Sequence, residues 1–339
     1  MAKLKTALVG ATLALTLSCM QAAAEPTKIR IGWNQAPGHM ASMTWHNPKA
    51  SYLHNNGKTY LAEPIRFQGT GHQVQAIAAG QLDVAAVSVS GLVSIVKNAG
   101  LEAVAIADVL NDNCEPGNFT QPFYARKDSG IATLADLKGK KIAINSRGSA
   151  HDMMVSAALA KGGVKDSDVT RIEMQFPAMV PFLKEGKVDV GGYLPQFVPP
   201  IDSDPSLKLL FTACDVLGPT ATVLLVAKKD FIATNRAALV DMMADHMRAL
   251  AWFYDPANRA GMLDIVSAVT KAPKENFADY VFTNKDFPRN RDLYIDPKII
   301  QNTIDKSIEF GAIKETLKVD PDYVDFSVVR DAKKQLTKM

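Results

Sequence analysis

The sequence predicts an α/β fold with two sheet-containing blocks and a helical C-terminal segment. Short apolar strands alternate with helices, first between residues 28 and 106 and again between 133 and 227. A stretch rich in turn-forming residues, 111–122, separates the two blocks. The chain has 339 residues, of which 47% are hydrophobic and 22% charged. This length and composition suffice for one or two cored domains and exclude a disordered chain.

The first block alternates four strands with two helices. Strands are expected at 28–32, 65–67, 84–87 and 104–106, and helices at 71–79 and 91–98. A glycine follows each helix, which is a common way for a helix to end. This alternation indicates an open, mainly parallel sheet with helices on its faces.

The second block continues the alternation and then becomes helical. Helices are expected at 133–139, 150–161 and 178–185, and strands at 141–144, 171–174, 188–191, 209–212 and 223–227. A second turn-rich stretch, 214–219, precedes the last of these strands. Beyond it, helices are expected at 235–254, 256–269 and 297–310.

The N-terminus has the pattern of a secretory signal peptide over residues 1–24. Lys3 and Lys5 precede the apolar run 6–17, and three consecutive alanines provide the small residues that a signal peptidase accepts. The run is shorter than the ~20 residues that a membrane-spanning helix needs. Lipid attachment at Cys19 is the alternative, but the residue three positions before it is Thr rather than the usual Leu.

The charge balance argues against nucleic-acid binding as the main function. The chain has 38 basic and 35 acidic residues, and loss of Lys3 and Lys5 with the signal peptide leaves 36 basic residues. No run of five basic residues offers the positive stripe that a phosphate backbone requires. The exported protein is expected to be nearly neutral.

Cys114 and Cys214 are the cysteines that follow the predicted signal peptide. In an oxidising compartment they can form one disulfide, and the alternative is two unpaired buried thiols. The sequence leaves both open because it does not give the distance between the two Cα atoms. The sequence contains none of the C-x-x-C, H-E-x-x-H or EF-hand spacings, so no metal or other cofactor is expected.

Four segments occur together in the order found in a known family. They are GQLDVAAVSVSGL (80–92), DSGIATLADLKGKKIAI (128–144), GSAHDMMVSAAL (148–159) and FPAMVPFLKEGKVDVGGYLPQF (176–197). In these segments the chain resembles the exported solute-binding proteins of ATP-driven (ABC) importers, specifically the nitrate/sulfonate/taurine and thiamine-precursor-like group. The resemblance extends over most of 28–230.

The resemblance implies a two-lobed fold of the type II periplasmic-binding-protein kind, with two chain crossings between the lobes. The crossings would fall in the two turn-rich stretches. The expected organisation is therefore lobe I from 25–115, lobe II from 116–215, and a return to lobe I with the helical segment over 216–339. The family also implies a monomer in the periplasm that binds a small molecule between its lobes and delivers it to a membrane permease and its ATPase.

Three strand-to-helix junctions provide candidate ligand-binding residues. In an open α/β sheet the ligand crevice lies beyond the carboxyl ends of the strands, where helix N-termini present backbone N–H groups. These donors favour a small organic anion, either a sulfonate or a carboxylate. Ordinary helix capping is the alternative for the serines, and a solvent position is the alternative for the first histidine. The candidates are Gly71, His72, Ser88, Ser90, Arg147, Gly148, Ser149 and His151.

Aromatic walls and further polar groups complete the expected site. Trp33, Asn34 and Gln35 follow the first strand, and Tyr193 follows another, so the two rings are expected to hold the ligand from opposite lobes; core packing is the alternative for both rings. Thr222 stands where taurine-like relatives present an aspartate to an ammonium group, which argues against an amino-sulfonate. Lower-ranked wall candidates are Pro177 with its neighbours Phe176 and Ala178, and Phe119 and Tyr124.

The segment 38–57 is longer than the pattern common in the family. It is expected either to reshape the mouth of the cleft or to form a longer surface helix. His54 fits the surface helix, whereas His39, Trp45 and His46 fit either.

Catalysis is not expected. An exported hydrolase needs a nucleophile, a base and a residue that orients the base, but no G-x-S-x-G is present, and His151 follows Ser149 at helical spacing. The thiamine-precursor synthase of the same superfamily uses a His- and Cys-rich iron motif that these two cysteines do not form. A ligand sensor for a membrane receptor remains an alternative because it would share the same lobes and cleft.

Overall fold

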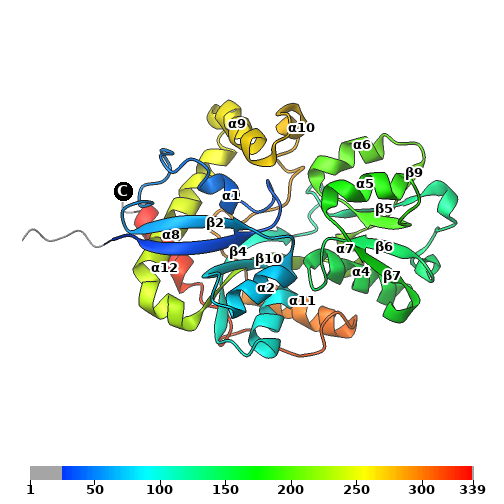
Figure 1. Ribbon diagram of the computed structural model, residues 1–339, viewed down its shortest axis with the longest axis horizontal. Helices are drawn as coiled ribbons and strands as arrows, with labels where there is room; N and C mark the ends of the chain where they lie inside the picture. The colour runs from blue at the N-terminus through cyan, green and yellow to red at the C-terminus, as the bar shows by residue number, and fades with distance from the viewer. Residues whose placement is uncertain (1–24, 338–339) are drawn as a thin grey trace, which may run out of the picture.

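The computed structural model describes residues 25–337 and arranges them in two lobes, each built on a five-stranded sheet flanked by helices (Figure 1). The predicted signal peptide and Cys19 lie outside the described residues. This architecture confirms the predicted two-lobed α/β fold. Of the helices described, none is both long and apolar enough to span a membrane.

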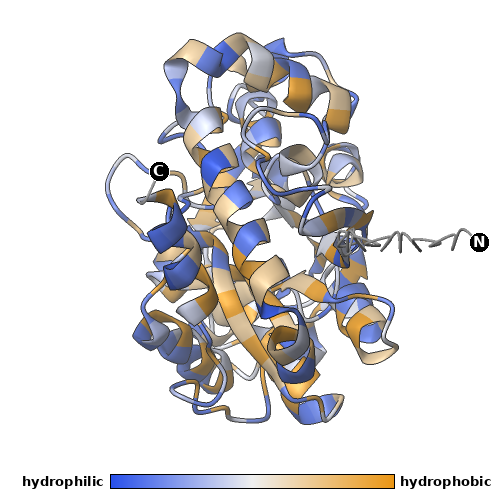
Figure 2. Ribbon diagram, turned by 90° about the vertical axis from the view of Figure 1, so that its left-hand side faces the viewer, coloured by the Kyte–Doolittle hydropathy of each residue, from blue (hydrophilic) through white to orange (hydrophobic). Residues whose placement is uncertain are grey.

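Lobe I contains the first sheet, in the strand order β2-β1-β3-β10-β4. Strand β1 is parallel to β2 and β3, whereas β10 is antiparallel to β3 and β4. The central strands β3 and β10 and the edge strand β4 are apolar and almost wholly buried, because helices cover both faces of the sheet (Figure 2). The strands are β1 (Thr27–Trp33), β2 (Tyr60–Arg66), β3 (Val84–Val87), β4 (Ala103–Asp112) and β10 (Thr220–Lys228).

The helices of lobe I come from both ends of the chain. Helix α12 packs on the long α8, and α11 packs on β10 and also contacts α4 of lobe II. They are α1 (Ala41–Thr44), α2 (Thr70–Ala78), α3 (Val89–Val93) with a following π-helical turn (Ser94–Asn98), α8 (Lys229–Tyr254), a 3-10 turn (Pro256–Asn258), α9 (Arg259–Thr270), α10 (Glu275–Ala278), α11 (Pro297–Glu309) and α12 (Ser327–Leu336).

Lobe II contains the second sheet, in the order β7-β6-β8-β5-β9. Strand β6 is parallel to β7 and β8, and β5 is antiparallel to β8 and β9. Its strands are β5 (Pro122–Arg126), β6 (Lys141–Ile144), β7 (Thr170–Glu173), β8 (Val190–Gly192) and β9 (Leu207–Thr212). Its helices are α4 (Ala150–Lys161), α5 (Phe176–Lys184), α6 (Val198–Asp202) and α7 (Ala213–Leu217), with 3-10 turns at Lys127–Ser129, Leu134–Leu137, Asp166–Asp168 and Pro195–Phe197.

The chain passes between the lobes twice, from β4 to β5 and from β9 to β10. Strand β5 follows the first crossing and pairs antiparallel with β9, which precedes the second crossing. Strand β10 follows the second crossing and pairs antiparallel with β4, which precedes the first. In each sheet four strands run in one direction and one, β10 in lobe I and β5 in lobe II, runs in the other, so both sheets are mixed but mainly parallel, as predicted.

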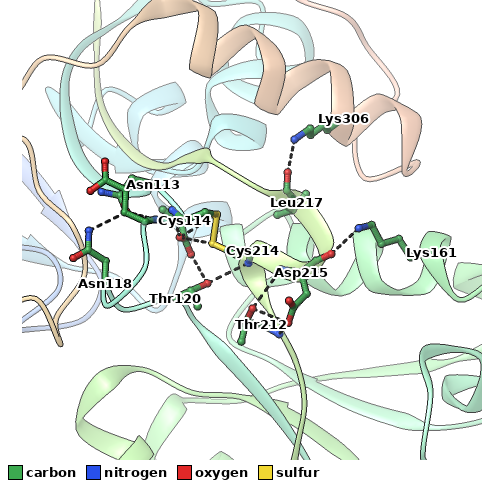
Figure 3. The surroundings of a disulfide bond; sticks show 12 residues. Asn113, Cys114, Asn118, Thr120, Lys161, Thr212, Cys214, Asp215, Leu217 and Lys306 are labelled. Atoms are coloured by element: carbon green, nitrogen blue, oxygen red, sulfur yellow. Dashed lines mark hydrogen bonds between the residues drawn. A yellow bond between two sulfur atoms is a disulfide. The ribbon is translucent and has the colours of Figure 1, made fainter.

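A disulfide joins the two crossings (Figure 3). It links Cys114, which follows β4, to Cys214 in α7, with the Cα atoms 5.6 Å apart. Thr120, from the first crossing, donates a hydrogen bond from its hydroxyl to Asp112 Oδ2 (2.8 Å) and accepts one from the Cys214 amide (3.1 Å). Of the two alternatives that the sequence leaves open, the disulfide is the one that forms.

The segment 38–57 packs against α8 and contains only the four-residue helix α1, so the expected longer surface helix is absent from it. The fully buried carboxylate of Asp245 accepts hydrogen bonds from the amides of His54 (2.9 Å) and Asn55 (3.0 Å) and from the hydroxyl of Tyr60 (2.8 Å). At the start of this segment, His39 lines the cavity between the two lobes.

Candidate ligand cleft

A cavity of about 60 Å³ lies between the lobes, at the carboxyl ends of strands from both sheets. Its wall is mostly uncharged, with both polar and apolar side chains. Lobe I and the C-terminal segment contribute Asn34, Gln35, His39, Thr70, Leu110, Thr222 and Phe287, and the first crossing and lobe II contribute Gln121, Asn145, Ser149, His151, Phe176 and Leu194.

Five residues proposed from the sequence line this cavity. Asn34 and Gln35 follow the end of β1, Ser149 and His151 begin α4, and Thr222 lies on β10. The same sheet-edge geometry therefore brings together groups that are up to 188 positions apart in the sequence. Phe176, a lower-ranked wall candidate, also lines the cavity.

The two proposed aromatic walls lie elsewhere. Trp33 packs against the core of lobe I, with the Arg66 guanidinium 5.6 Å from its ring centroid. Tyr193 is fully buried within lobe II and donates a hydrogen bond from its hydroxyl to the carbonyl of Met179 (3.2 Å). Neither residue lines the cavity, so core packing describes both. Pro177 and His72 are exposed and likewise lie outside the cavity lining.

Ser88 and Ser90 form a contact between the lobes. Both hydroxyls donate hydrogen bonds to the carbonyl oxygen of Gly148, each at 2.8 Å. Ser88 also caps α3 by accepting a hydrogen bond from the amide of Gly91 (3.2 Å). Two of the three predicted junctions therefore meet each other across the cleft, and we call this set of hydrogen bonds the serine contact.

Gly69 and Gly71 belong to the same meeting of the lobes. A Cβ on Gly69 would lie 2.1 Å from Ser146 Oγ of lobe II, and one on Gly71 would lie 3.5 Å from the carbonyl oxygen of Arg147. The lobes can approach this closely only because Gly69 has no side chain. Gly71 thus contributes to lobe contact and lies outside the cavity lining.

Two amides and one hydroxyl at the start of α4 donate hydrogen bonds within lobe II. The amide of Gly148 donates to Asp152 Oδ2 (2.9 Å), the amide of Asp152 donates to Ser149 Oγ (3.1 Å), and the hydroxyl of Ser149 donates to Asn145 Oδ1 (2.7 Å). This is ordinary helix capping, which is the alternative that the sequence left open. Arg147 is half exposed and lies 3.9 Å from Asp152 Oδ1, so its charge faces lobe II carboxylates.

His151 is the most unusual polar group in the cavity wall. Its ring is 3% exposed, stacks on Phe176 with the centroids 5.5 Å apart, and meets the edge of Phe123 at 4.8 Å. Neither ring nitrogen has a hydrogen-bond partner among the described residues. Burial, with the nearby Arg171 cation, lowers the pKa of His151 to about 3, so the ring is neutral at pH 7.

Two other buried polar atoms of the wall also have no partner within the described chain. They are Nε2 of Gln121, at the first crossing, and Oγ1 of Thr222, in lobe I. Both side chains are at least nine-tenths buried. Because leaving a buried polar group unpaired is costly, these atoms indicate where a bound molecule would make hydrogen bonds.

The charged group that lines the cavity is Asp286, from the segment between α10 and α11. Arg289 donates to Asp286 Oδ2 at 2.9 Å, and the amides of Phe282 and Phe287 also donate to this carboxylate. His39, on the same side, has its pKa lowered to about 4 by burial and by Arg289, so it is neutral at pH 7. It accepts a hydrogen bond from the amide of Asn34 (3.4 Å).

Sequence reasoning missed Gln121, Asp286 and Phe287. Gln121 directly precedes β5, and the other two lie in an irregular segment without hydrophobic periodicity. The one available signal is a polar residue near the end of the turn-rich stretch, directly before the apolar run PFYA, and it applies to Gln121 alone.

The family model described as "NMT1/THI5 like" matches residues 64–259. The chain belongs to this family. Four curated proteins from Brucella also match; the one from Brucella abortus (strain 2308) bears a name that describes it as a candidate binding protein. It is 28% identical over 206 residues, which span 60% of this chain and 60% of that protein.

Solved structures share the fold. The alkanesulfonate-binding protein SsuA from Xanthomonas axonopodis pv. citri, bound to MOPS, superposes with a TM-score of 0.67 at 18% identity, covering 89% of this chain and 99% of its own. The periplasmic nitrate-binding protein NrtA from Synechocystis PCC 6803 gives 0.68 at 16% identity, covering 92% and 89%. The aliphatic sulphonate-binding protein SsuA from Escherichia coli gives 0.64 at 17% identity, covering 88% and 97%.

Proposed function

We propose that this protein is the solute-binding component of an ATP-driven importer in the periplasm. It acts as a monomer that captures a small molecule between its lobes and delivers the molecule to a membrane permease. The observation that carries the proposal is the set of unpaired, buried polar atoms contributed to one cavity by lobe I, lobe II and the crossing between them. The family and the fold of its solved neighbours support it.

The mechanism follows from where the contacts lie. A ligand that meets Thr222 in lobe I and His151 in lobe II makes both sets of contacts only while the lobes are closed. Binding therefore shifts the equilibrium from open towards closed forms. The serine contact adds protein hydrogen bonds that exist only in the closed arrangement, so part of the closing free energy comes from the protein itself.

The class of ligand expected from the sequence is a small organic anion, a sulfonate or a carboxylate, and it can be aromatic. Three of the solved neighbours are a nitrate-binding and two sulfonate-binding proteins, which supports an oxyanion. Donors such as Gln121 Nε2 and Thr222 Oγ1 suit its oxygen atoms.

The test is capture of a solute by the protein comprising residues 25–339. The purified protein is refolded to remove any carried ligand, incubated with a deproteinised small-molecule extract of bacterial cells, and separated by gel filtration. Bound molecules are then released and identified by mass spectrometry. One solute enriched over a control protein, and released chemically unchanged, is the expected result. The absence of any enriched solute contradicts the proposal, and a chemically altered product favours a hydrolase.

A sensor for a membrane receptor would capture a solute equally well. Neighbouring genes separate the two functions, since adjacent permease and ATPase genes favour import. Reconstitution with the neighbouring permease and ATPase, followed by uptake of the captured solute into vesicles, tests import directly.

A further inference from the structure

The wall of the cleft offers no unpaired positive charge within residues 25–337, and this bears on the chemistry of the solute. Three arginines lie nearby, and each one faces a carboxylate. Arg289 pairs with Asp286 (2.9 Å), Arg171 pairs with Asp152 and Asp166, and Arg147 lies 3.9 Å from Asp152. None of the three lines the cavity.

The carboxylate of Asp286 is the charge nearest to the cavity, and it is negative. The side chain of its partner Arg289 is 2% exposed and also donates to the carbonyl of Phe287 (3.0 Å). Asp286 itself is 2% exposed and lines the cavity. An anion in the cavity would therefore meet a carboxylate before it met the guanidinium, and like charges repel.

The helix that starts at the cavity is a poor substitute for a cation, because an acidic residue lies in its first turn. The Gly148 and Asp152 amides at the start of α4 are already bonded to side chains, and the Asp152 carboxylate sits in the first turn, where it offsets the positive end of the helix dipole. A buried anion without a positive partner loses its hydration without compensation.

Among the described side chains that line the cavity, the buried groups that await a partner are uncharged. They are the amide nitrogen of Gln121, the neutral ring of His151 and the hydroxyl of Thr222. A primary amide donates, a neutral imidazole has one donor and one acceptor nitrogen, and a hydroxyl can do either. Phe176 and Phe287 also line this cavity and provide apolar contact.

Building on the function proposed above, we infer that the solute is uncharged: a small polar molecule, such as a carboxamide, that both accepts and donates hydrogen bonds to Gln121, His151 and Thr222. A sulfonate or carboxylate accepts hydrogen bonds only, and it would lack a cation in this cavity. The inference thus reverses the charge expected from the sequence while keeping the cleft and the transport function.

The test uses matched pairs that differ only in charge: benzamide and benzoate, nicotinamide and nicotinate, propionamide and propionate, and methanesulfonamide and methanesulfonate. Each is added at 10 mM to the protein at pH 7.5, and the melting temperature is measured, because a molecule that binds the native state raises it. We expect a rise of at least about 2 °C with one or more uncharged members and a smaller rise with each anionic partner. A larger rise with any anion overturns the inference, as does the absence of a rise with all four uncharged compounds.

Variants then show whether binding uses the named groups. For the uncharged compound with the largest shift, calorimetry should give an affinity about fivefold to tenfold lower for Thr222→Val and for Gln121→Leu, each of which removes one hydrogen bond. Thr220→Val is the matched control: Thr220 lies on the same strand, is buried and has an unpaired hydroxyl, but it does not line the cavity. Equal losses in Thr220→Val and Thr222→Val would overturn the inference.

The capture experiment separates this inference from the function on which it rests. A captured solute that is uncharged at pH 7 agrees with both. A captured anion overturns the inference and leaves the proposed function standing, whereas a protein that captures nothing contradicts the proposed function.

Discussion

Removal of the disulfide between the two crossings should destabilise the protein by several kcal/mol. Cys114 and Cys214 are 100 positions apart, so their bond closes a loop that contains almost the whole of lobe II. In the chain-entropy model, a loop of about 100 residues loses enough freedom in the unfolded state to stabilise the fold by about 4.7 kcal/mol at 25 °C. Measured values are often smaller, in the range of about 2 to 4 kcal/mol.

The assay is urea unfolding of the double variant Cys114→Ser/Cys214→Ser and of the wild type, both without the first 24 residues. The slope of the unfolding free energy against urea is about 3 kcal/mol per molar at the upper end of the usual range. A loss of about 4.7 kcal/mol would then lower the midpoint by roughly 1.5 M urea. The wild type treated with a reductant should match the variant, which controls for the two serines.

The reasoning fails if the midpoint falls by less than about 0.3 M, which corresponds to roughly 1 kcal/mol. That result would mean that the unfolded chain already keeps the crossings together. Separate unfolding steps for the two lobes would be fitted separately, and the loss should then appear in the step that unfolds lobe II, because the bond encloses that lobe.

Three further predictions concern the closed form and its stability. The double variant Ser88→Ala/Ser90→Ala removes the serine contact and should weaken solute affinity by about tenfold, because two hydrogen bonds of roughly 0.5–1.5 kcal/mol each are lost from the closed form alone. The loss should come from faster dissociation of the solute. Stopped-flow measurements give the dissociation rate, and an unchanged rate would contradict this prediction. Gly69→Ala places a Cβ 2.1 Å from Ser146 Oγ, so it should open the lobes and enlarge the radius of gyration measured by X-ray scattering. The melting temperature should stay within about 2 °C of the wild-type value. An unchanged radius of gyration with solute bound would refute this prediction. His151 should make stability depend on pH: the unfolded ring takes up a proton near pH 6.5 and the folded ring only near 3, so stability falls as pH drops from 6.5 towards 3, by up to about 1.4 kcal/mol per pH unit. Urea unfolding at pH 5 and 7 should show a smaller difference in His151→Gln than in the wild type, and equal differences would contradict this assignment.

The element pattern could be predicted from the sequence because it depends on local periodicity. The helix expected at 150–161 forms with those bounds, and the strands at 84–87 and 141–144 do as well. The sequence does not predict strand β5, because its first residue, Pro122, ends the turn-rich stretch that indicates a boundary. The antiparallel strands of both sheets depend on pairings between distant segments, which local periodicity does not contain.

The site was only partly predictable for a related reason. The sequence marks the junctions after buried strands, but it does not show what each junction faces across the cleft. Ser88 meets Gly148, 60 positions away, rather than the cavity. Tyr193 follows a buried strand, as a cleft residue would, yet its ring turns into lobe II. Asp286 comes from an irregular segment, so its arrival at the cavity depends on the packing of the whole C-terminal region.

The strand order also sets the order in which the molecule can be assembled. Lobe II is formed by one continuous stretch, so it can fold as soon as that stretch is available. In the first sheet, β10 lies between β3 and β4, although 107 residues separate the end of β4 from its start. Because the chain is synthesised from its N-terminus, β4 has no strand partner until lobe II, the second crossing and β10 have been made. We therefore expect the apolar strand β4 to be the segment most exposed to wrong association in a newly made chain, and lobe I to be the last part to reach its native form.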